Sequence, residues 1–174
     1  MFKTDSEGYS LMEVIVVLAI ISVLCSLAFA SMQDYAGSIR LRSAVETLAA
    51  DIRLARITAW SGRESCYLSF DPTTNSYTMN GSRYVNIPEG IRFGTDPSVK
   101  GKPTEPGEMP PADGISFESE GIKNRAHFHP KGTVIPAGAL YLTNGKETMA
   151  ITVTLTGRTR LWRSCGGKKW TALS

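Results

Sequence analysis

Near its amino terminus this chain has a long apolar segment that begins beside a single carboxylate, Glu13. The segment from Val14 to Gln33 contains no charged residue and no proline. At ~1.5 Å of rise per residue, about 20 helical residues span the ~30 Å hydrocarbon core of a bilayer. We therefore expect residues 9–33 to form a helix that crosses a membrane. A carboxylate at the edge of such a helix is costly without a cation, so Glu13 predicts a positively charged partner.

The residues around Glu13 form a recognisable motif, which reads Gly8-Tyr9-Ser10-Leu11-Met12-Glu13. It resembles the amino-terminal signature of type IV prepilins and type II secretion pseudopilins. In that family a prepilin peptidase cleaves after the glycine, the new amino terminus is methylated, and residue five of the mature chain is a glutamate. The resemblance implies a leader over residues 1–8 and cleavage between Gly8 and Tyr9. It also implies that Glu13 pairs with the Tyr9 amine of a neighbouring subunit during assembly.

An ordinary secretory signal peptide is the competing interpretation of this region. Ala28, Phe29 and Ala30 form an A-x-A site after an apolar stretch, so cleavage would leave Ser31 as the first residue. The segment before the apolar run does not suit that role, because Lys3 is its one basic residue. A single membrane anchor that is not processed is a third possibility, and sequencing the mature amino terminus separates the three.

The sequence predicts that the helix continues beyond the apolar segment, over residues 34–62. Apolar and charged residues alternate there at helical spacing, and Gly62 is a typical helix stop. The charged residues are expected to form a solvated face with i to i+4 pairs, and Trp60 is expected to cap the core. The alternative is that Arg53, Arg56 and Arg63 form a second site that binds an anion. The apolar residues are Ile39, Leu41, Val45, Leu48, Ile52, Leu54 and Ile57, and the charged ones include Glu46, Asp51, Arg53, Arg56 and Arg63.

After Gly62 the periodicity changes from that of a helix to that of strands. Many short alternating segments with frequent turns predict a globular β domain over residues 63–174, built as an antiparallel β-sandwich. The fold class is therefore α+β, with the long amino-terminal helix packed on the sandwich. Residues 94–114 lack apolar periodicity and predict a long mobile loop. The strand candidates lie at 66–70, 77–79, 83–87, 91–93, 115–118, 126–129, 140–143, 149–154 and 158–162.

Three internal segments carry a narrower resemblance. Residues 48–63 read LAADIRLARITAWSGR, residues 128–132 read FHPKG, and residues 151–160 read ITVTLTGRTR. They resemble the GspH/FimT family of minor pilins and pseudopilins, which places a long helix against two packed β-sheets. The resemblance implies other pilins or pseudopilins as partners and an inner-membrane protein with a single span. Its carboxyl-terminal domain would lie in the periplasm and, after assembly, at a filament tip.

The last 27 residues contain five basic residues and no acidic one, which favours an anionic partner. The motif Gly157-Arg158-Thr159-Arg160 resembles the GRxR element with which FimT-type minor pilins of natural transformation bind DNA. On a strand, Arg158 and Arg160 would point to one face. The predicted DNA-binding residues are Arg158, Arg160, Arg163, Lys168 and Lys169, and Trp162 or Trp170 could stack on exposed bases. The alternative is a structural type II secretion pseudopilin of the H type that binds no DNA.

The remaining chemistry-bearing residues suggest structural roles. Cys66 and Cys165 would both be exported, so a disulfide between them is a candidate that spacing alone does not decide. His127 and His129 sit at strand spacing without an evident third ligand, so no metal site is predicted. Because no catalytic motif is present, we expect neither an enzyme nor a cofactor.

Overall fold

The computed structural model describes residues 10–105, 107–166 and 169–173, without the side chains of residues 27–31, 33 and 34. The chain divides into two units, Met1–Ala36 and Gly37–Ser174. A single helix, α1 (Leu11–Gly62), contributes residues to both units. It ends at Gly62, the residue at which the sequence predicts a helix stop.

The described part of the amino-terminal unit consists of Ser10 and the first part of α1. Ser10 begins the helix, because its hydroxyl accepts a hydrogen bond from Met12 N at 3.3 Å and its carbonyl accepts one from Glu13 N at 3.0 Å. All side chains from Leu11 to Ser26 are exposed. Among the residues that the structure describes, no helix is both long and apolar enough to cross a membrane. This finding differs from the expectation of a membrane-crossing helix over residues 9–33. Residue 9 and the side chains of residues 27–31 and 33 lie outside the described part of that segment.

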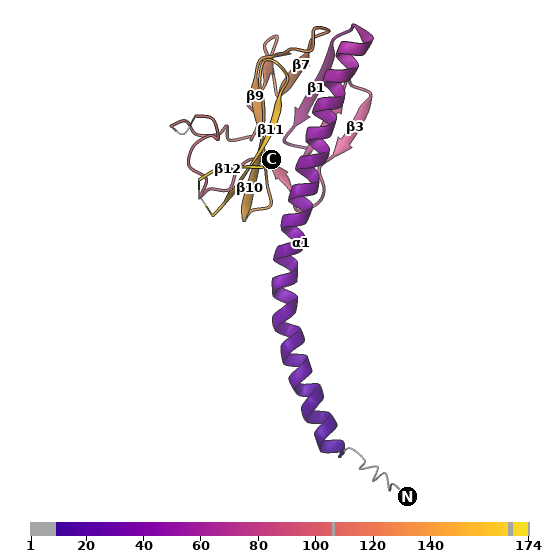
Figure 1. Ribbon diagram of the computed structural model, residues 1–174, viewed down its shortest axis with the longest axis vertical. Coiled ribbons are helices and arrows are strands. Elements are labelled where there is room, and N and C mark those ends of the chain that lie inside the picture. Colours follow the sequence, from indigo (N-terminus) through magenta and orange to yellow (C-terminus); the bar gives the residue numbers. More distant parts are fainter. Residues whose placement is uncertain (1–9, 106, 167–168, 174) are drawn as a thin grey trace, which may run out of the picture. The chain divides into compact units, whose positions relative to one another are not determined.

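The second unit places the rest of α1 beside two antiparallel sheets (Figure 1). Each sheet has five strands, in the orders β3-β2-β1-β7-β8 and β12-β11-β10-β9-β4, and β5 and β6 form a small hairpin. We call the first sheet A and the second sheet B. The strands of sheet A are β1 (Cys66–Asp71), β2 (Ser76–Met79), β3 (Arg83–Asn86), β7 (Arg125–Phe128) and β8 (Val134–Ile135). Those of sheet B are β4 (Arg92–Phe93), β9 (Gly138–Thr143), β10 (Glu147–Val153), β11 (Thr159–Cys165) and β12 (Thr171–Leu173), and the hairpin joins β5 (Glu118–Ser119) to β6 (Ile122–Lys123).

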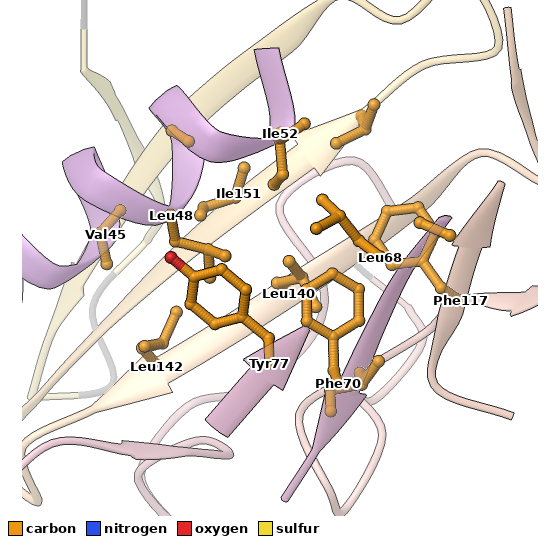
Figure 2. Packing of buried hydrophobic residues seen from close by; sticks show 14 of the residues in the cluster. Val45, Leu48, Ile52, Leu68, Phe70, Tyr77, Phe117, Leu140, Leu142 and Ile151 are labelled. Atoms are coloured by element: carbon orange, nitrogen blue, oxygen red, sulfur yellow. The ribbon is translucent and has the colours of Figure 1, made fainter. Parts of the chain in front are cut away.

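One apolar core is shared by the helix and both sheets. Figure 2 shows Val45, Leu48 and Ile52 of α1 over side chains from β1 and β2 of sheet A and from β9 and β10 of sheet B. The helix presents Leu41, Val45, Leu48 and Ile52 at spacings of three and four residues, and each is at most 2% exposed. The predicted α+β architecture is therefore confirmed. Removing a buried leucine side chain from such a core costs about 2–5 kcal/mol.

The expectation that Asp51 lies on a solvated face of the helix is wrong. Asp51 is not part of a solvated face but is 5% exposed, because it lies under Tyr77 of β2 and Arg83 of β3. Conversely, the apolar side chains of Leu54 and Ile57 are 41% and 58% exposed, since the core contacts only one stripe of the helix. Helical periodicity indicates which face of the helix is apolar, but the sheets determine how many residues of that face are buried.

The segment over residues 94–114 contains turns and bends in its described part, which leaves out residue 106. It is bonded to sheet B at several points. Gly94 N donates to Tyr141 O at 3.0 Å, Asp96 N donates to Thr148 Oγ1 at 2.9 Å, and Trp170 Nε1 donates to Gly101 O at 2.8 Å. The segment thus lies over the face of sheet B that carries Tyr141.

Candidate functional site

The amino-terminal site is described only in part. Gly8 and Tyr9 lie outside the described residues. Glu13 occupies the first turn of α1, where the helix dipole favours a carboxylate. Its side chain is exposed and forms no ion pair with a described residue. The carboxylate is therefore available to a cation from outside the described chain.

Arg158 and Arg160 lie at the start of β11, in the hairpin that joins it to β10. Arg160 is paired with Thr152, and the ladder continues beyond the strand because Thr154 N donates to Arg158 O at 3.0 Å. Alternation along the strand places the two arginines on one face. Both are exposed, and neither forms an ion pair with a described residue. They are thus two cations that are free to contact an anion.

The two tryptophans of this region are packed into the fold. Trp162 Nε1 donates to Thr152 Oγ1 at 3.0 Å, and the Arg160 guanidinium carbon lies 5.6 Å from the centroid of the Trp162 ring. Trp170 is half-buried and lies 6.0 Å from the Tyr141 ring, between ring centroids. Both indole N–H groups already have acceptors, so these rings support the surface that carries the arginines.

Arg163 differs from the two preceding arginines because it is neutralised. Its Nη2 atom lies 2.8 Å from Glu147 Oε1, and its Nε atom donates to Glu147 Oε2 at 3.2 Å. Burial raises the pKa of Glu147, but the hydrogen bonds and charge of Arg163, with further hydrogen bonds from Cys165 and Ser38, outweigh it and hold the pKa below its ordinary value. Lys168 lies outside the described residues, and Lys169 is exposed just before β12. Arg163 therefore fixes β11 to β10 and supplies no free charge.

A cleft of about 620 Å³ lies next to the arginines on the same face of sheet B. Its lining includes Lys102, Tyr141, Thr152 and Thr154, and the two threonines lie directly opposite Arg160 and Arg158. The Tyr141 hydroxyl is buried without a hydrogen-bond partner among the described residues. Burial and the charge of Glu105 raise the pKa of Tyr141 to about 12, so this hydroxyl remains protonated at neutral pH. The face thus combines cations with hydroxyl groups.

Gly157 of the predicted motif has a structural role that the sequence does not reveal. Its φ is +73°, and a Cβ atom there would lie 2.5 Å from Arg56 Nε. Arg56 in turn donates from Nε to Gly132 O at 3.0 Å. Glycine at 157 therefore allows Arg56 of the helix to lie beside the hairpin that carries Arg158. The only sequence signal for this contact is the pair of glycines, Gly132 and Gly157.

Trp60 is 67% exposed, so the expectation that it caps the core is wrong. The core at this end of the helix is closed instead by Ala55 and Ala59, which are 0% and 1% exposed. Trp60 follows Ala59 directly and therefore lies outside the buried stripe of the helix.

Cys66 and Cys165, the candidate disulfide pair that the sequence left undecided, are free thiols. Cys66 begins β1, four residues after the end of α1, whereas Cys165 is paired with Glu147. Glu147 accepts a hydrogen bond from Ser38 at 3.1 Å, near the other end of the packed part of the helix. The helix between Ser38 and Gly62 is about 36 Å long at ~1.5 Å per residue, far beyond the ~7 Å that a disulfide permits.

The two histidines lie in an aromatic stack on sheet A. The His127 ring centroid lies 4.4 Å from that of Tyr67 and 4.0 Å from that of His129. Burial, the neighbouring His129 and the Arg125 charge lower the pKa of His127, against the opposing effect of Glu120. In the part of the chain that the structure describes, no group of three or more potential ligands could hold a metal ion.

The chain is similar to known proteins in its amino-terminal motif and in its fold. Residues 3–29 match the model of the prokaryotic N-terminal methylation motif, and none of the curated sequences compared with the chain matches it. The minor pseudopilin EpsH from the type 2 secretion system of Vibrio cholerae has a similar fold, with a TM-score of 0.50 and 11% identity, over 74% of this chain and 99% of that chain. The type IV minor pilin FimU of Pseudomonas aeruginosa gives a TM-score of 0.49 and 15% identity, over 79% of this chain and 95% of that chain. The motif and the EpsH-like fold support the resemblance to GspH/FimT-type minor pilins.

Proposed function

We propose that this chain is a minor pilin or pseudopilin that assembles into a type IV pilus or a type II secretion pseudopilus. The observation that carries the proposal is the methylation motif over residues 3–29 in a chain whose globular unit has a pilin-like fold. Prepilin peptidase cleaves between Gly8 and Tyr9, and the new amine is methylated. The amino-terminal helix holds the protein in the inner membrane before assembly, with the carboxyl-terminal domain in the periplasm.

Glu13 is the proposed assembly residue. Its carboxylate is exposed and is not paired within the described chain, so a neighbouring subunit's amino-terminal amine is free to bind it. Removing one partner of a buried ion pair costs about 3–5 kcal/mol. Glu13→Gln should therefore be processed normally and fail to enter filaments.

Mass spectrometry of the mature protein tests this part of the proposal. The expected product begins at Tyr9 and carries one methyl group, and Gly8→Ala is expected to block its formation. A product that begins at Ser31 would refute the pilin assignment and support a secretory signal peptide.

We further propose that the Arg158 and Arg160 face binds DNA without sequence preference, as a receptor for DNA uptake. Both guanidinium groups are exposed and form no ion pair with a described residue, and the two arginines lie opposite Thr152 and Thr154, which line the cleft. Two phosphate contacts predict a slope of about −1.8 for log K against log salt, and a third contact from Lys169 about −2.7. Such binding is weak, and several copies at a filament tip would strengthen it through avidity.

A DNA-shift assay with the double variant Arg158→Glu and Arg160→Glu tests this proposal. Binding should be lost while the near-ultraviolet circular dichroism stays that of the wild type. The matched control is Arg40→Glu with Lys123→Glu, which changes the net charge equally at exposed positions on α1 and β6. Equal DNA binding by the two double variants would refute the proposal.

A purely structural pseudopilin is the second candidate function. It is favoured because the indole N–H groups of Trp162 and Trp170 donate to acceptors within the domain, and because Arg163 is paired with Glu147. These contacts leave few groups on sheet B free to bind DNA. Wild-type protein that gives no DNA shift at low salt yet assembles into filaments would select this function.

A further inference from the structure

A second hollow lies at the carboxyl-terminal end of α1, outside the cleft on sheet B. It has a volume of about 320 Å³ and is lined by Arg56, Ile57, Trp60, Lys131 and Gly132. We call this surface the helix-end hollow. The Trp60 side chain is 67% exposed and that of Ile57 is 58% exposed. Large apolar side chains gathered in one exposed depression are typical of a binding surface.

Both charged residues that line the helix-end hollow are basic. Arg56 and Lys131 line it, and Arg53 and Arg63 are exposed on the same end of the helix or just after it. None of the four forms an ion pair with a described residue, although the exposed Glu64 follows Arg63 in sequence. An indole beside several unpaired cations favours a ligand that is both anionic and aromatic.

Arg56 connects the helix-end hollow to the proposed DNA-binding face. Its Nε atom is bonded to Gly132 O at 3.0 Å, and it lies so close to Gly157 that a Cβ atom there would be 2.5 Å away. Gly157 directly precedes Arg158. A second contact joins the same segments, because Val134 N donates to Leu155 O at 2.9 Å. The helix-end hollow and the hairpin that carries Arg158 therefore adjoin each other where Arg56 lies beside Gly157.

We infer that the helix-end hollow binds single-stranded DNA, with a base stacked on Trp60 and neighbouring phosphates on Arg56 and Lys131. This inference rests on the proposed DNA binding and makes it specific. Bases in a duplex are stacked on each other and hidden from the indole, whereas a single strand exposes them. The Trp60 surface therefore gives the protein a preference for single strands that Arg158 and Arg160 alone do not provide.

Fluorescence anisotropy of the full chain in detergent micelles measures this preference. The probes are a fluorescein-labelled oligothymidylate and a labelled duplex of equal length. Trp60→Ala should weaken single-strand binding roughly five- to 150-fold, the range that corresponds to the loss of one stacked base, and should change duplex binding less than about twofold. Trp60→Phe should restore part of the loss. The control is Tyr84→Ala, which removes another aromatic ring, 73% exposed, on β3.

The outcomes separate this inference from the proposed function. Single-strand binding that is unchanged in Trp60→Ala, with duplex binding still dependent on Arg158 and Arg160, would overturn the stacking surface alone. Loss of filament assembly in Trp60→Ala with unchanged single-strand binding would overturn it too, because it would identify the hollow as a subunit contact. A wild-type protein that binds neither probe would overturn the proposed DNA binding itself.

Discussion

The substitution Tyr77→Phe tests how the helix is held on sheet A. Tyr77 Oη donates to Asp51 Oδ2 at 2.6 Å, and Arg83 Nη2 lies 3.1 Å from Asp51 Oδ1. Asp51 is 5% exposed and Tyr77 is 2% exposed, so water does not replace a lost partner. Burial and the bond to Asp51 raise the pKa of Tyr77, which keeps the hydroxyl protonated as a donor.

Removing this hydroxyl leaves a buried carboxylate with one hydrogen bond fewer and almost no new cavity. A hydrogen bond to a charged group contributes about 1.5–3 kcal/mol, so we expect the free energy of unfolding to fall by that amount. For a domain of this size, the loss corresponds to a decrease in Tm of roughly 5–12 °C. Near-ultraviolet circular dichroism follows the unfolding of the globular unit while the exposed part of α1 contributes little.

Tyr84→Phe is the matched control, because Tyr84 lies on β3 and its side chain is 73% exposed. It should change the free energy of unfolding by less than about 0.5 kcal/mol. If Tyr77→Phe and Tyr84→Phe unfold at the same temperature, the buried contact with Asp51 does not stabilise the helix, and the reasoning fails.

Three further predictions follow from single contacts. Gly157→Ala should lower the free energy of unfolding by about 1–3 kcal/mol in chemical denaturation, because alanine is strained at a φ of +73° and its Cβ would displace Arg56. A fall in pH below the ordinary pKa of histidine should destabilise the protein, since burial lowers the pKa of His127 and the unfolded chain therefore binds the proton first. Urea titrations at several pH values should find that the free energy of unfolding depends less on pH in His127→Phe than in the wild type. Non-reducing peptide mapping should find no link between Cys66 and Cys165, and a linked peptide would contradict the observed fold.

Several features of the fold could be predicted from local sequence patterns. The spacing of Leu41, Val45, Leu48 and Ile52 indicates the buried stripe of α1, and all four are buried. Several of the longer strands follow an alternation of apolar and polar residues, as in β1. The short strands β6, β8 and β12 have no such pattern, because two or three residues are too few to show a period and their pairing depends on a neighbouring strand.

The candidate site was harder to predict, because the state of a charge depends on distant residues. Five basic residues near the carboxyl terminus look alike in sequence. The register of β10 against β11 brings Glu147 to Arg163 and leaves Arg158 and Arg160 without a carboxylate partner among the described residues. Pairing across a sheet thus selects which cations are free.

The amino-terminal motif and the class of fold could be read from the chain, since both depend on residues that are adjacent or regularly spaced. The surroundings of individual side chains became visible only in the folded protein. Folding buried Asp51 beneath two strands, exposed Trp60 at the end of the helix, and separated Cys66 from Cys165 by the length of the domain. The physical reason is that burial and ion pairing arise from segments far apart in the chain, which meet only when the helix and both sheets close around one core.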